Sequence, residues 1–266
     1  MLREKSFDTC IVVSPTFLTA LMVFLSGIKK RVGSGYRLYS FLFNKKVFEH
    51  RKYADKHELE FNVNLLKEIG INEQVSVDNV NFHLKVNPTS LELVKKILRD
   101  SNIDLTKKLI IAHPGSGGSS IDLPVEKFAE FIGKLTKLDN ITVVITGDKK
   151  EQEICRSVVG DSNAINLSGK FNLSGIIGLI SMCSLFASNS TGPIHIAAAL
   201  GKATIGFYPK IKVCSSERWG PFTGKKAVFK PEIDCFNCSR EQCEKLDCMN
   251  SIDIDNVISE AIKLLA

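Results

Sequence analysis

The chain has 266 residues, of which 44% are hydrophobic and 24% are charged, and its formal net charge is +6. This composition is that of a globular protein with one large or two small domains, and it excludes a disordered chain, a collagen-like repeat and a coiled coil. The basic excess is too small to indicate nucleic-acid binding by itself. No signal-peptide pattern is recognised, so we expect a cytoplasmic protein with reduced thiols.

An uncharged stretch near the N-terminus allows three interpretations. Residues 10–28 carry no charge and are followed by three basic residues, which resembles a membrane span with a positive flank. The prediction we favour is a buried strand at 9–13, a break at Pro15 and a core helix at 17–25. A membrane span or signal anchor and an interfacial helix are the alternatives.

The rest of the first hundred residues shows only fragments of a strand–helix pattern. A short strand is expected at 31–33, and a helix over 56–69 would end at Gly70. A helix at 91–98 lies in a polar region that looks like a connection between domains. We therefore expect a first, incomplete domain over 1–90.

From residue 109 onward, short apolar runs alternate with longer helical patterns. Such repeated units predict a parallel sheet with helices on both faces, a Rossmann-like domain over 91–250, and a C-terminal helix within 251–266. The expected strands are 109–112, 141–146, 165–167, 185–187 and 203–207. The expected helices are 124–138, 149–159, 173–183, 193–200 and 253–265.

Two of the expected strand-to-helix loops have the residues of an anion site. The loop at 113–120 is rich in Gly and Ser, so its backbone N–H groups would either cradle a phosphate or form a plain flexible turn. In the second loop, Thr191, Gly192 and His195 stand at the start of a helix, where an anion is favoured. The alternative there is a helix cap beside a surface histidine.

The second loop is part of a longer block, NSTGPIHIAAALG at 189–201, and this block resembles glycosyltransferase family 9, the heptosyltransferases of lipopolysaccharide inner-core synthesis. Further matching segments are FD at 7–8, KRVG at 30–33, HPG at 113–115, LPVEKF at 123–128, GD at 147–148, RWGP at 218–221 and the C-terminal cysteines. The resemblance extends over nearly the whole chain.

The resemblance implies an α/β fold of the GT-B type, with two facing Rossmann-like domains, of which the N-terminal one would be incomplete. It implies inverting, metal-independent transfer of a heptose or related sugar from an ADP-sugar donor to a lipid A-core type acceptor, with no cofactor. A carboxylate would deprotonate the acceptor hydroxyl. The family's opening strand and the Gly-Asp loop that supplies this carboxylate have no counterpart here, so the catalytic residue is unknown.

The resemblance also assigns donor-binding residues by position. They are Ser116, Gly117, Glu151, Ser190, Thr191, Gly192 and His195. Thr191, Gly192 and His195 would bind the diphosphate, and Glu151 would lie near the ribose. Ser190 stands where the family has Asp, and Ile121 stands where it has Lys. These replacements and the absent base favour the alternative function, that of a catalytically inactive homologue that only binds a nucleotide sugar or an anionic glycolipid.

A basic segment near the N-terminus is independent of the resemblance. Residues 29–56 contain nine Lys or Arg against two acidic residues, a local net charge of +7. One interpretation is that this segment contacts phosphorylated lipid cores or an anionic membrane surface, so that the protein makes peripheral contact with the inner membrane. The alternative is a solvated face of scattered lysines. Nucleic acid is not expected, because few aromatic residues interleave with these charges.

Four cysteines, Cys235, Cys238, Cys243 and Cys248, fall within fourteen residues. Four thiolates this close are able to hold one structural zinc ion. One or two disulfides and free thiols are the alternatives. A catalytic thiol is not expected, because no histidine lies nearby in the sequence.

Overall fold

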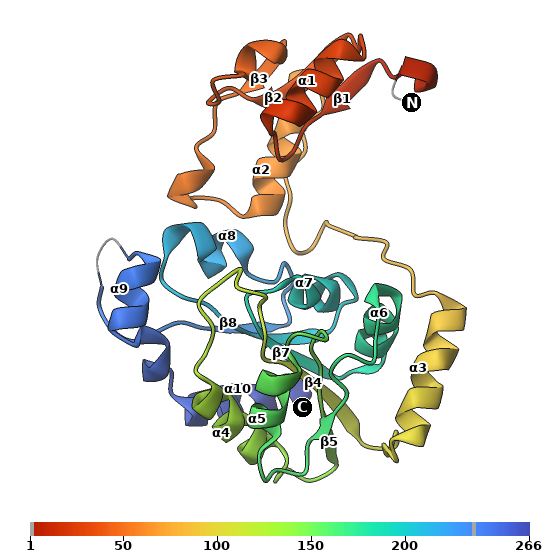
Figure 1. Ribbon diagram of the computed structural model, residues 1–266, viewed down its shortest axis with the longest axis vertical. Helices are drawn as coiled ribbons and strands as arrows, with labels where there is room; N and C mark the ends of the chain where they lie inside the picture. The colour runs from red at the N-terminus through yellow and green to blue at the C-terminus, as the bar shows by residue number, and fades with distance from the viewer. Residues whose placement is uncertain (1–2, 236–237) are drawn as a thin grey trace. The chain divides into compact units, whose positions relative to one another are not determined.

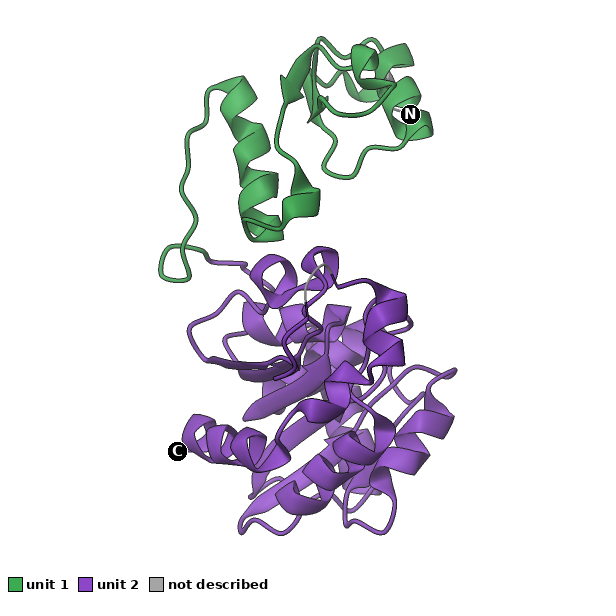
Figure 2. Ribbon diagram, turned by 90° about the vertical axis from the view of Figure 1, so that its left-hand side faces the viewer, with its two compact units in different colours: residues 1–80 green, residues 81–266 purple. Residues whose placement is uncertain are grey.

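The computed structural model describes residues 3–235 and 238–266 and divides the chain into two compact units, Met1–Val80 and Asn81–Ala266 (Figure 2). The division falls before the expected one at residue 90. Helix α3 (Pro88–Asp100) packs on α6 (Leu173–Met182), and α10 (Ile254–Leu265) packs on α4 (Val125–Leu135). Both helices therefore belong to the second unit, and 251–266 is not a separate part.

The first unit holds a three-stranded parallel sheet in the order β1-β2-β3, formed by Thr9–Ile11, Lys30–Ser34 and Lys45–Val47. Helix α1 (Phe17–Leu25) follows β1, as the strand–loop–helix interpretation predicted. In the described part of the chain, no helix is long and apolar enough to span a membrane.

The predicted helix at 56–69 forms in two pieces. Helix α2 (Glu58–Asn64) continues into a 3-10 turn, Leu65–Ile69, and the turn ends at Gly70 with a φ of +88°. Glycine fits this end because it adopts a positive φ without strain. The other 3-10 turns of the described chain are Arg3–Lys5, Ser40–Leu42, Arg51–Tyr53, Lys212–Cys214 and Cys248–Ser251.

The second unit is built on a six-stranded sheet in the order β6-β5-β4-β7-β8-β9, and every neighbouring pair is parallel. Its strands are β4 (Lys108–His113), β5 (Ile141–Ile145), β6 (Ile165–Asn166), β7 (Leu185–Asn189), β8 (Ala203–Phe207) and β9 (Lys226–Phe229). The predicted α/β class with a parallel sheet is confirmed. β9 was not predicted.

Helices cover both faces of this sheet (Figure 1). Besides α3, α4, α6 and α10, the described helices of the second unit are α5 (Gln152–Val159), α7 (Gly192–Ala199), α8 (Ser216–Trp219) and α9 (Arg240–Lys245). One core lies between the sheet and α4, α5 and α10, and the other lies between the sheet and α3, α6 and α7. Asn172 caps α6 as predicted, since its side chain accepts a hydrogen bond from the Gly175 N–H.

The strand order reverses between β4 and β7, which are neighbours in the centre of the sheet. From β4 the chain builds outward through β5 and β6, and from β7 it builds outward in the opposite direction. In open parallel sheets, the crevice at such a reversal is the usual ligand site. The loops after β4 and β7 meet there, and they are the two loops in which the sequence analysis placed an anion.

Candidate functional site

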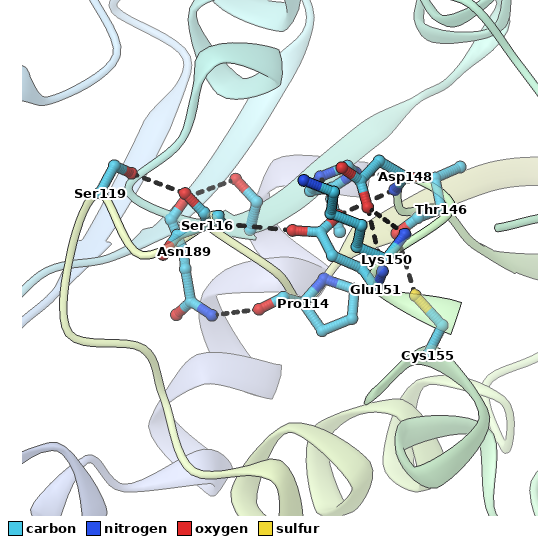
Figure 3. Close-up of polar contacts among 12 residues, drawn as sticks. Pro114, Ser116, Ser119, Thr146, Asp148, Lys150, Glu151, Cys155 and Asn189 are labelled. Carbon is cyan, nitrogen blue, oxygen red and sulfur yellow. Dashed lines mark hydrogen bonds and ion pairs between the residues drawn. The ribbon is translucent and has the colours of Figure 1, made fainter. Parts of the chain in front are cut away.

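A buried asparagine at the end of β7 fixes the loop that follows β4, here called the Gly/Ser loop (residues 114–123). The Asn189 amide N–H donates to the Pro114 carbonyl at 2.5 Å (Figure 3). The Asn189 amide oxygen accepts from the Leu123 N–H at 2.9 Å. Asn189 is fully buried. One side chain thus holds both ends of the loop, and removing it would leave buried backbone groups without partners. The sequence analysis did not assign Asn189 a role.

The middle of the Gly/Ser loop is held by the Glu151 carboxylate. One oxygen accepts from the Gly117 N–H at 3.3 Å and the other from the Asp148 N–H at 2.8 Å (Figure 3). A Cβ atom at Gly115 would overlap this carboxylate, so any larger residue there would displace the Glu151 side chain. The carboxylate therefore ties the loop after β4 to the loop after β5.

A buried histidine lies beneath this contact. His113 Nδ1 is 3.0 Å from the Thr146 hydroxyl, and Nε2 is 3.7 Å from Glu151 Oε2. Burial lowers the pKa of His113, and the Glu151 and Asp148 carboxylates oppose that shift. We interpret His113 as a neutral part of the scaffold under the loop.

The first of two cavities opens at the N-terminus of α7 and is called the α7 cavity. It has a volume of about 430 Å³ and is lined by Ser119, Ser190, Thr191, Gly192, His195 and Trp219, among others. Thr191 is the residue immediately before the helix, and its hydroxyl accepts no hydrogen bond from the N–H groups of the first turn. The helix dipole, the Thr191 hydroxyl and the His195 imidazole therefore converge on a place suited to an anion.

The second cavity, called the loop cavity, has a volume of about 460 Å³ and is lined by Ser116, Gly117, Asp122 and Glu151, among others. The predicted donor residues are thus brought together in two groups. Ser190, Thr191, Gly192 and His195 line the α7 cavity. Ser116, Gly117 and Glu151 line the loop cavity, and the Gly/Ser loop contributes to both walls.

Asp122 is a half-buried acid that lines the loop cavity. Among the described residues, one of its carboxylate oxygens has no hydrogen-bond partner, and neither does the Ser120 hydroxyl. Burial raises the pKa of Asp122 to about 6, from an ordinary value of 3.8. Because the folded state holds this proton more tightly than the unfolded state, the contribution to stability is complete below pH 3.8 and is lost as the pH rises through 6.

Replacing Asp122 with asparagine is therefore expected to stabilise the protein by about 2 kcal/mol at pH 7.5, where Asp122 is charged, and to have little effect at pH 4. Urea unfolding at both pH values measures the difference. An equal effect at both pH values would show that Asp122 is not the titrating group.

The segment that carries the four clustered cysteines packs beside the same loop. The Arg240 guanidinium donates to the carbonyls of Gly118 and Ser120, each at 3.2 Å. Cys235 and Cys238 form a disulfide, and their Cα atoms are 6.2 Å apart, a separation that a disulfide spans.

The disulfide corrects the expectation that all thiols are reduced. Cys243 and Cys248 are free and buried, and burial raises the pKa of Cys243 to about 11. In the described ranges, no group of three or more His, Cys, Asp or Glu is arranged to hold a metal ion, and the structural zinc considered for the four cysteines stays a prediction. Two of the four thiols, those of Cys235 and Cys238, are bonded to each other.

Comparison with known proteins places this chain in a family. The model of glycosyltransferase family 9 (heptosyltransferase) matches residues 1–248. Among curated relatives, lipooligosaccharide heptosyltransferase 2 of Campylobacter jejuni is 25% identical over 228 residues, which are 82% of this chain and 67% of that protein.

Solved structures agree on the fold. A family 9 glycosyl transferase from Veillonella parvula has a TM-score of 0.80 at 19% identity, covering 99% of this chain and 77% of that chain. The E. coli ADP-heptose LPS heptosyltransferase II has a TM-score of 0.76 at 20% identity, covering 99% of this chain and 78% of that chain. The family model extends over most of both units, and the chain therefore belongs to glycosyltransferase family 9, the heptosyltransferases.

Proposed function

We propose that this protein transfers a heptose or a related sugar from an ADP-sugar donor to a lipopolysaccharide core acceptor, with inversion at the anomeric carbon and without a metal ion. The observation that carries the proposal is the α7 cavity, in which Thr191, Gly192 and His195 meet at a helix N-terminus. The choice of sugar follows the family, and the choice of nucleotide follows the ADP-heptose for which the similar E. coli heptosyltransferase is named.

The diphosphate is assigned to the α7 cavity. The N–H groups of the first turn of α7 have no partner within the helix, so they are available to phosphate oxygens. The Thr191 hydroxyl and the His195 imidazole add donors on the same side. The ribose is assigned to the region of Glu151, whose carboxylate lies where the Gly/Ser loop separates the two cavities.

In the proposed reaction, the acceptor hydroxyl loses its proton to a carboxylate and attacks the anomeric carbon of the sugar. The bond between that carbon and the β-phosphate oxygen breaks, and ADP leaves with the electron pair. The residues of the α7 cavity would stabilise the charge that develops on the diphosphate. We assign no residue of this chain as the base.

The acceptor and the membrane are assigned to the first unit. Its basic segment at 29–56 has a net charge of +7, and large apolar side chains next to these charges are exposed. Examples are Leu38, which is fully exposed, and Phe41, which is 71% exposed. Such a surface suits a phosphorylated lipid core at the cytoplasmic face of the inner membrane.

Transfer can be tested with purified protein, ADP-heptose and lipopolysaccharide that lacks inner-core heptose. The expected result is a gain of one heptose by the acceptor in mass spectrometry, release of ADP, and unchanged transfer in the presence of EDTA. Binding of ADP-heptose without transfer would contradict the enzymatic function and favour a homologue that only binds. The observation that favours this second function, binding without transfer, is that Ser190 replaces the family's Asp and Ile121 replaces its Lys.

A further inference from the structure

The lining of the α7 cavity contains a side chain with a permanent positive charge, that of Arg218. A nucleoside diphosphate carries several negative charges, and the neighbouring loop cavity is lined by three acidic residues, Asp122, Glu151 and Glu153, and by Lys150. Among the described residues that line the α7 cavity, one carries a permanent positive charge, and it is Arg218. A dianionic or trianionic ligand in this cavity would therefore meet the Arg218 guanidinium.

Arg218 lies in α8 and is half-buried. Its guanidinium carbon lies 5.1 Å from the centre of the Trp219 ring, a cation–π stacking distance. The Trp219 ring is edge-on to the imidazole of His195, with 6.4 Å between the ring centres. Arginine, tryptophan and histidine thus form a continuous stretch of the cavity wall.

Hydrogen bonds hold the Trp219 part of this wall in place. The Trp219 indole N–H donates to the Val213 carbonyl at 3.0 Å, and the Tyr208 hydroxyl donates to the Trp219 carbonyl at 3.0 Å. Tyr208 itself is fully buried. A guanidinium that stacks on an anchored indole has lost part of its rotamer freedom before any ligand binds, so less entropy is lost when it forms a hydrogen bond.

We propose that Arg218 binds the diphosphate of the donor and, with the N-terminus of α7 and His195, encloses it within the α7 cavity. The planar guanidinium presents paired N–H donors that match two phosphate oxygens, which an ammonium group cannot do. This inference rests on the proposed function, since it assumes that a nucleoside diphosphate enters the cavity.

Calorimetric titration of the full chain with ADP and with adenosine tests the inference. We expect Arg218→Met to weaken ADP binding by about 10- to 100-fold, which is the usual contribution of a charge-assisted hydrogen bond. Adenosine binding should be unchanged, because adenosine has no phosphate. Arg218→Lys keeps the charge but loses the paired donors, so it should fall between Met and the wild type. Trp219 is the sole tryptophan of the chain, so its fluorescence reports whether the cavity wall is intact.

Lys212→Met is the matched control, because Lys212 is an exposed residue six positions earlier that does not line the cavity. It should bind ADP like the wild type. If wild-type protein binds ADP and Arg218→Met binds it equally well, the inference is wrong and the proposed function stands. Equal weakening of ADP and adenosine would assign Arg218 a structural role and also overturn the inference. A wild type that does not bind ADP would contradict the proposed function itself.

Discussion

Replacing Phe207 with alanine is expected to lower the free energy of unfolding of the second unit by about 3–5 kcal/mol. Phe207 is fully buried on β8, and its ring centre lies 5.6 Å from that of Phe128 and 5.9 Å from that of Phe131. The substitution removes the ring shared by the sheet and α4 and leaves a cavity that the rigid surroundings cannot fill. Urea unfolding followed by circular dichroism measures the loss.

Leu173→Ala in the same unit is the control. Leu173 is 67% exposed at the start of α6, so its truncation should change stability by less than about 0.5 kcal/mol. If Phe207→Ala proves too unstable to purify, Phe207→Leu provides a smaller loss at the same site. Similar losses for Phe207 and Leu173 would contradict the assignment of the aromatic cluster as the centre of this core.

Replacing Gly115 with alanine is expected to weaken ADP binding at least about tenfold and to destabilise the protein by about 2 kcal/mol. The new methyl group would take the space of the Glu151 carboxylate, which is the end of a flexible side chain and therefore moves away. Its hydrogen bonds with the N–H groups of Gly117 and Asp148 would be lost, and the Gly/Ser loop would lose its fixed shape. Calorimetry with ADP and urea unfolding measure the two effects.

Gly133→Ala is the matched control for this prediction. Gly133 lies within α4, and a Cβ atom there would meet nothing within 4 Å. Alanine should stabilise the helix by about 0.5–1 kcal/mol. A double-mutant cycle sharpens the test, because Gly115→Ala should have little further effect once Glu151 is already alanine. Full additivity of the two substitutions would contradict the proposed contact.

The second unit was largely predictable, and its exceptions have local causes. Its inner strands are short apolar runs bounded by glycine, proline or polar residues, and they are buried on both faces, so the pattern is unambiguous. β9 is an edge strand of four residues that begins with Lys226, and α9 has six residues, five of them polar or charged. Neither is long enough to show a period.

In the first unit, too, short elements without a clear hydrophobic pattern were not predicted. α1 was predicted with both ends correct, because Pro15 and Gly27 flank an apolar stretch. β3 was missed because Lys45–Val47 has two exposed lysines and no alternation. Its place in the sheet depends on pairing with β2, which a local pattern does not contain.

Contacts between distant residues account for what the sequence did not reveal about the site. The motifs identified the right loops, but Asn189 contacts Pro114 across 75 residues and Leu123 across 66, which follows only from the pairing of β4 with β7. The division of the predicted residues between two cavities has the same origin. Arg218 was noted only as part of a matching segment, and its relation to His195 required the fold.

The most direct test of a donor site in the α7 cavity is calorimetric titration of the full chain with ADP, repeated for His195→Ala. Wild-type protein should bind one ADP per chain, and His195→Ala should bind about tenfold or more weakly, because one hydrogen-bond donor to the diphosphate is lost. If wild-type protein does not bind ADP, or if the affinity is the same without the imidazole, the α7 cavity is not the donor site.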